Sequence, residues 1–229
     1  MSDAAFRIGY LVFPDITQLD LTGPQQVLAR LPGAQQLLVG KTREPVRSES
    51  GLMLLPDATY ADCPKLDMIC VPGGPGMNAL LTDADTLDFL RRVAAKARYV
   101  TAVCTGSLVL GAAGLLKGRR AATHWAAMEF LPSFGATAVD ERVVVDGNVI
   151  TGGGVTAGID FGLRVVAEVG GETLAKAIQL MVEYDPAPPF DCGHPRSADP
   201  AVLAMLRERM APMHTQRAAQ VGKAAAKLA

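Results

Sequence analysis

One cysteine, Cys104, stands where a nucleophile would act. It follows the apolar run Tyr99–Val103, which is typical of a buried strand, and it precedes a helical pattern that begins near Gly106. Such a turn holds a nucleophile at the carboxyl end of a sheet, and the N–H groups and partial positive charge of the helix N-terminus favour a thiolate over a thiol. A buried structural role is the commoner role of a lone cysteine, but this position favours a catalytic one.

Asp20 is the candidate proton donor. It lies in the segment Gln18–Gly23, at the end of the loop after the first predicted strand, and its leucine neighbours suggest an inward position. A carboxyl is costly there unless it is paired. Beside a thiolate its pKa should rise, which suits an acid–base role near neutral pH. A role as the N-cap of the following helix accounts for this residue equally well.

Glycines and a histidine complete the candidate site. Gly73 and Gly74 follow another buried strand, and their N–H groups, with that of Thr105, would form oxyanion-type donors above the sulfur; alternatively, they only break the strand. His124 stands next to the only tryptophan and is either a base for the cysteine or a helix cap. The three glycines at 152–154 either allow close backbone approach to the site or pack against the turn.

The sequence gives no sign of a cofactor. The three histidines, His124, His194 and His214, lack metal-ligand spacing, and we expect His194 and His214 to lie at the surface. Neither a GxGxxG nor a P-loop pattern occurs, which argues against a nucleotide. We therefore predict no metal and no cofactor.

The elements that must position these residues alternate between strand and helix. Buried strands are predicted at 8–13, 66–71 and 99–103, and helical patterns follow them at 19–31, 83–97 and 107–116. The Asp146–Gly147 turn predicts a hairpin over 142–150, with helices at 157–169 and 172–182. This order predicts an α/β fold: a doubly wound, mainly parallel sheet with helices on both faces.

Composition limits the function classes. The 229 residues are 49% hydrophobic and 20% charged, which is enough for a full core, and at roughly 150 residues per domain they form one domain with an appendage. The net charge of −1 gives no bulk attraction for nucleic acid or an anionic membrane. No apolar run approaches the ~18 residues of a membrane span, the N-terminus does not resemble a secretory signal, and four cysteines without CxxC spacing do not suggest a disulfide scaffold. We expect a soluble, cytoplasmic protein.

The regular pattern ends at Pro186–Phe190. We divide the chain into an α/β domain at 1–190 and a C-terminal helical extension at 191–229 that packs on the domain or on a dimer partner. Residues 196–229 carry six basic and two acidic side chains, which favours a solvated helix. Nucleic-acid binding is disfavoured, because there is no helix-turn-helix pattern and little aromatic content.

Six segments carry a resemblance to a known family: Ile8–Pro14, Leu19–Pro24, Val71–Gly74, Val103–Ser107, Ala122–Trp125 and Thr151–Asp160. Together they resemble the isocyanide hydratase branch of the ThiJ/PfpI superfamily, which is related to class I glutamine amidotransferases. The likeness runs from about residue 6 through the segment 183–190. It implies a flavodoxin-like homodimer that hydrates an isocyanide, R–N≡C, to an N-formamide, R–NH–CHO, without a cofactor.

The resemblance also implies roles for individual residues. Cys104 would be the nucleophile that forms a thioimidate, and Asp20 would be its general acid/base. The substrate-binding residues would be Gly74 and Thr105, which give main-chain donors, with Gly153 and Val155 lining the pocket. The best-known form of the family has Ile where Val155 stands, a difference that would alter the size of the pocket. Other branches carry Glu at the position of Asp20 or His directly after the cysteine, which disfavours a protease or deglycase.

Two alternatives belong to other function classes. The same domain resembles the ligand-sensing half of AraC-type regulators, but only about 40 residues follow the proline-rich segment, fewer than the ~50 of a small DNA-binding domain. The other alternative is a redox or stress-response protein in which Cys104 is oxidised reversibly, since helix-terminal N–H donors suit a sulfenate or sulfinate.

Overall fold

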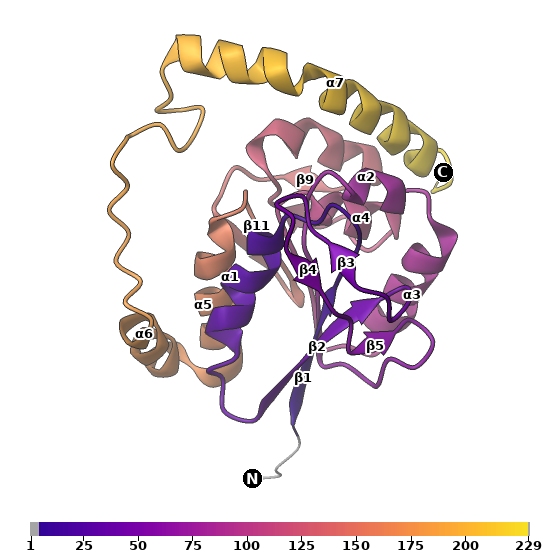
Figure 1. Ribbon diagram of the computed structural model, residues 1–229, viewed down its shortest axis with the longest axis vertical. Helices are drawn as coiled ribbons and strands as arrows, with labels where there is room; N and C mark the ends of the chain where they lie inside the picture. Colours follow the sequence, from indigo (N-terminus) through magenta and orange to yellow (C-terminus); the bar gives the residue numbers. More distant parts are fainter. Residues whose placement is uncertain (1–4, 229) are drawn as a thin grey trace.

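Seven strands form the central sheet of the computed structural model, which describes residues 5–228 (Figure 1). Their order is β10-β11-β7-β6-β1-β2-β5, and all neighbours are parallel except β10 and β11. The strands are β1 (Phe6–Leu11), β2 (Ala34–Gly40), β5 (Ala58–Thr59), β6 (Met68–Val71), β7 (Tyr99–Val103), β10 (Val143–Asp146) and β11 (Val149–Gly152). The predicted strands and hairpin are present. The sequence reasoning missed β2, whose paired glutamines and partly buried side chains weaken its apolar signal.

Helices cover both faces of this sheet, which confirms the predicted fold class (Figure 1). Helix α1 packs on α5 and α5 on α6, while α3, α4 and the 3₁₀ helix η1 form the layer on the other side. The helices are α1 (Gln18–Leu28), α2 (Met77–Leu80), α3 (Ala84–Ala94), α4 (Gly106–Ala112), η1 (Trp125–Phe134), α5 (Ala157–Gly170) and α6 (Glu172–Met181). Two small sheets pair β3 (Val46–Arg47) with β4 (Met53–Leu54) and β8 (Arg120–Ala121) with β9 (Thr137–Ala138).

A long helix, α7 (Pro200–Ala225), closes the end of the molecule opposite the N-terminus (Figure 1). A mostly exposed segment, 183–199, runs along the outside to reach it. Asp199 caps α7, its carboxylate accepting a hydrogen bond from the N–H of Ala201 at 2.7 Å. The helix packs against η1, α2 and α4. The tail is helical, as predicted, but its solvated character holds only in part, because Arg217 is 3% exposed.

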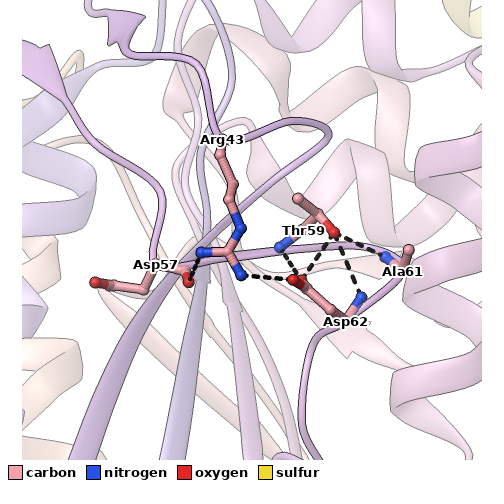
Figure 2. Close-up of polar contacts among 5 residues, drawn as sticks. All are labelled: Arg43, Asp57, Thr59, Ala61 and Asp62. Atoms are coloured by element: carbon pink, nitrogen blue, oxygen red, sulfur yellow. Dashed lines mark hydrogen bonds and ion pairs between the residues drawn. The ribbon is translucent and has the colours of Figure 1, made fainter.

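A polar network fixes the edge of the sheet at β5 (Figure 2). The Arg43 guanidinium donates to the carbonyl of Asp57 at 2.8 Å and to the Asp62 carboxylate at 2.5 Å. The N–H and hydroxyl of Thr59 donate to the other oxygen of Asp62, at 2.6 and 2.8 Å. These donors, led by the Thr59 N–H, lower the pKa of Asp62 to about 2. The network thus holds the loop after β5, at the edge strand four positions from β7 in the sheet order.

Across residues 5–228, no helix has the length and apolar character needed to cross a membrane.

Candidate active site

Cys104 occupies the turn between β7 and α4, as the sequence predicts. Its φ of +57° lies in the left-handed region, which non-glycine residues rarely adopt. Hydrogen bonds hold it there: its N–H donates to the carbonyls of Gly152 and Gly153 at 3.1 and 2.9 Å, and its carbonyl accepts from the Thr123 hydroxyl at 2.8 Å. A Cβ on Gly106 would come within 1.9 Å of the Val71 carbonyl, so this tight turn requires glycine there. The surrounding fold therefore imposes the strained backbone of Cys104.

Asp20 lies in the first turn of α1 and is fully buried. Its Oδ2 accepts a hydrogen bond from the N–H of Gly73 at 2.9 Å, while Oδ1 has no hydrogen-bond partner among residues 5–228. The N-cap of α1 is Thr17, so the alternative that Asp20 caps this helix is wrong. Burial raises the pKa of Asp20 to about 7, against the lowering effects of the adjacent Cys104 thiol and the Gly73 N–H. Its carboxyl therefore exchanges protons near neutral pH.

The surroundings of Cys104 favour its neutral thiol over the thiolate. Burial, and next to it the charge of Asp20, raise the pKa of Cys104 well above its ordinary value. The N–H groups of Val155 and Thr105 lie against the sulfur and act in the opposite sense, but they do not outweigh burial. The helix N-terminus thus favours a thiolate as expected, through the Thr105 N–H, but burial outweighs this effect. A thiol stands beside a carboxyl group that can take its proton.

The two glycines after β6 serve the site differently from the prediction. The Gly73 N–H is bonded to Asp20, and the Gly74 N–H donates to the Thr105 hydroxyl at 3.2 Å, so neither is a free donor above the sulfur. The N–H groups at the sulfur are those of Thr105 and Val155. A Cβ on Gly73 would come within 2.5 Å of Thr105 Oγ1 and 2.9 Å of Asp20 Oδ2. Glycine at 73 thus permits the close approach of these three residues.

A cavity of about 210 Å³ opens onto Cys104. Its lining is Thr17, Glu49, Gly74, Pro75, Cys104, Thr105, His124, Val155, Met210, Met213 and Arg217. Gly153 lines a neighbouring cavity of about 500 Å³, and Val155 and His124 border both cavities. Of the predicted site residues, Gly74, Cys104, Thr105, His124 and Val155 thus line the cavity at Cys104, whereas Asp20 is in the lining of neither cavity.

His124 is a helix cap. Its Nδ1 accepts a hydrogen bond from the N–H of Ala126 at 3.2 Å, which confirms the capping alternative. Burial, and then the charge of Arg217, lower the pKa of His124 to about 4, so the imidazole is neutral. No hydrogen bond joins it to Cys104 in the described chain. His124 is therefore a neutral wall of the cavity in this structure.

The other two histidines lie partly exposed near the surface, as predicted. His194 contacts Asp140 at 3.2 Å, and His214 contacts Glu129 at 3.0 Å. Residues 5–228 contain no cluster of three or more His, Cys, Asp and Glu side chains placed for a metal ion.

The sequence reasoning missed the contribution of α7 to the site. Met210, Met213 and Arg217 line the cavity from this helix, 106 or more positions after Cys104 along the chain. A signal was available, because residues 210, 213, 217, 221 and 224 recur at intervals of three and four, which places them on one helical face. The six basic side chains of residues 196–229 suggested a solvated helix, although this largely apolar face runs along it.

The chain is similar to known proteins over most of its length. The chain matches the DJ-1/PfpI family over residues 7–168. It is 57% identical to isonitrile hydratase of Pseudomonas putida over 98% of both chains. A crystal structure of a ThiJ/PfpI family protein from Pseudomonas syringae is 45% identical, covers 96% of this chain and 91% of its own, and superposes with a TM-score of 0.93. The transcriptional regulator GbdR of Pseudomonas aeruginosa is 30% identical over 78% of this chain and 50% of its own.

Proposed function

The chain belongs to the DJ-1/PfpI family, and we propose from this that it is an isocyanide hydratase, converting R–N≡C to R–NH–CHO. The observation that carries the proposal is the burial of a thiol and a carboxyl group side by side at the end of β7 and the start of α1. The similarity to isonitrile hydratase over nearly the full length of both proteins supports the same reaction. No cofactor takes part in the proposed chemistry.

In the first step, Asp20 moves a proton from sulfur to carbon. The Asp20 carboxylate accepts the proton of the Cys104 thiol as the sulfur attacks the terminal carbon of the isocyanide. That carbon is electrophile and latent carbanion at once, so it then takes the proton from Asp20. The product is a thioimidate, R–N=CH–S–Cys104, which contains every atom of the substrate and of the thiol.

In the second step, water adds to the thioimidate. Asp20, ionised again, accepts a proton from the water as the water oxygen bonds to the carbon, and passes that proton to the imine nitrogen, which becomes N–H. The tetrahedral adduct then breaks its carbon–sulfur bond, releasing the formamide and returning a proton to the sulfur. Each half of the cycle requires the Cys104–Asp20 pair to hold one negative charge in total.

The remaining predicted residues bind and shape the substrate. The N–H groups of Thr105 and Val155 face the sulfur, so they are placed to stabilise negative charge that develops on it. Gly74 holds Thr105 through its hydroxyl, and Gly153 holds the backbone of Cys104. Val155 lines the cavity where the resemblance has Ile in its best-known form, so this enclosure accepts a slightly larger group.

We propose a cytoplasmic homodimer with an isocyanide as its small-molecule partner. Large apolar side chains are exposed on the single chain. Leu180 and Phe190 are 83% and 78% exposed, and Met181 and Met205 are each more than 60% exposed. A second copy that covers them would remove this apolar surface from water. A reducing compartment would keep the thiol of Cys104 available.

The division of the chain at 190 into domain and extension stays a prediction.

The regulator alternative is not favoured. The match to isonitrile hydratase extends over 98% of both chains, whereas the match to GbdR leaves half of that regulator uncovered. The match to isonitrile hydratase likewise supports hydration over the redox alternative.

The test is formamide production from an aryl isocyanide, followed by absorbance, with native protein and Cys104→Ala side by side. Native protein is expected to turn over and the variant to fall to the uncatalysed rate, because the nucleophile is gone. Near-native turnover by Cys104→Ala would contradict the mechanism. Absence of turnover by native protein with aryl and several alkyl isocyanides would contradict the proposed reaction.

A further inference from the structure

Arg217 is a buried cation on α7 that no carboxylate neutralises. It is 3% exposed, and its Nε donates to the Asn78 side-chain oxygen at 3.1 Å. Across residues 5–228 it forms no ion pair, and its terminal nitrogens make no hydrogen bond. A buried charge is costly unless it is compensated. The guanidinium instead faces the two cavities that Arg217 lines.

Arg217 and the nucleophile Cys104 line the same cavity. Burial lowers the pKa of Arg217, and the charge of Cys104 acts in the opposite direction and raises it. The pKa of His124, which lines the same cavity, is lowered by burial and then by this guanidinium. Arg217 thus lies within electrostatic reach of the nucleophile, although it comes from the last helix of the chain.

The other ionisable groups near the pair leave the cation uncompensated. Asp20 comes from α1, and Glu49 lines the cavity from the loop after β3, where it accepts a hydrogen bond from the Thr17 hydroxyl at 2.6 Å. Burial, and less strongly the charge of Asp20, raise the pKa of Cys70 of β6 to about 12, so it stays a neutral thiol. The groups of the adjoining groove between η1 and α7 are Glu129, Arg207 and His214.

We propose that Arg217 is the counter-cation of the single negative charge that Cys104 and Asp20 share, and that α7 thereby activates the nucleophile. Arg217 is a positioning residue that acts through the sulfur. This inference rests on the proposed function only for the identity of the substrate. With a positive charge nearby, moving the proton from Cys104 to Asp20 creates a stabilised thiolate, which the N–H groups of Thr105 and Val155 alone do not secure.

The test measures the alkylation rate of Cys104 by iodoacetamide against pH, following the Cys104 peptide by mass, with the midpoint reporting the first proton that the Cys104–Asp20 pair loses. For Arg217→Met the midpoint of the profile should move up by at least about one pH unit, as expected when an opposite charge is removed. Arg217→Lys, which keeps the charge, should stay close to native. Formamide turnover should follow the same order, with the loss in kcat rather than in KM.

Two variants on the same helix separate charge from packing. Lys223→Met removes an exposed positive charge, and Val221→Ala removes a buried apolar group outside the cavity; neither should move the midpoint. Arg217→Met should fold with an unchanged or higher thermal midpoint, because methionine removes a buried charge. If it does not fold, Arg217→Gln takes its place.

A native midpoint in the folded Arg217→Met or Arg217→Gln variant would overturn the inference, as would an equal shift in Lys223→Met. Alkylation needs no isocyanide, so the two proposals fail separately. A shifted midpoint without any formamide production by native protein would contradict the proposed function alone. An unshifted midpoint with normal turnover would contradict the role of Arg217 alone.

Discussion

Asp20 and Asp62 carry the same side chain in opposite surroundings. Asp20 is fully buried with a single backbone donor, and burial raises its pKa to about 7. Asp62 lies at the surface, where the Thr59 N–H, Arg43 and the Thr59 hydroxyl lower its pKa to about 2 (Figure 2). The difference between the two pKa values follows from the surroundings. A carboxyl group that is buried with one donor titrates near neutral pH, whereas an exposed one with several donors stays ionised.

Replacing each aspartate by asparagine should separate the two roles most strongly. Asp20→Asn should lower formamide production by about 10²–10⁴-fold, because an amide cannot carry a proton from sulfur to carbon. Asp62→Asn is the matched control and should stay within about twofold of native, since its network lies at the β5 edge. Normal turnover by a folded Asp20→Asn variant would place the acid elsewhere.

The donor to Asp20 offers a second test. In Gly73→Ala the new Cβ would lie 2.5 Å from Thr105 Oγ1 and 2.9 Å from Asp20 Oδ2, so it should push the carboxyl from its place beside Cys104. A displacement of about 1 Å costs on the order of 10²-fold in rate. Gly222→Ala, where a Cβ meets nothing within 4 Å, should keep native kcat/KM. Equal rates in the two variants would show that the position of Asp20 is not critical.

The smallest expected effect is on stability. The folded-state pKa of Asp20, about 7, lies above its ordinary 3.8, so its contribution is fully present below about pH 4 and is lost as pH rises toward 7. Asp20→Asn lacks this loss and should exceed native protein by about 1–4 kcal/mol in free energy of unfolding at pH 8. Urea unfolding at pH 4 and pH 8 measures the difference. A gap that is the same at both pH values would contradict a raised pKa.

Much of the fold and part of the site follow from local sequence. Apolar strands that end in turn residues predict β1, β6 and β7, and the position of Cys104 between β7 and α4 follows from the same pattern. The parallel strand β2 was missed because its glutamines interrupt the apolar run. The ionisation of Cys104 could not be predicted from the sequence, because burial outweighs the helix N-terminus, and burial is a property of the assembled core.

The contribution of α7 depends on long-range packing. Nothing near Arg217 in sequence shows that its helix will cross the carboxyl end of the sheet, although the helical spacing of Met210, Met213 and Arg217 marks the face that becomes buried. The sequence predicts which side of α7 is buried, but the elements on which it packs are known only from the tertiary structure.

The most direct test of the account is the mass of the Cys104 peptide after native protein is mixed with an isocyanide and rapidly quenched. The mechanism predicts a gain of one whole isocyanide on Cys104, because the thioimidate keeps every atom of thiol and substrate. Cys104→Ala should gain nothing and release no formamide. Formamide release by that variant at the native rate, or an adduct on another residue during turnover, would contradict the central claim.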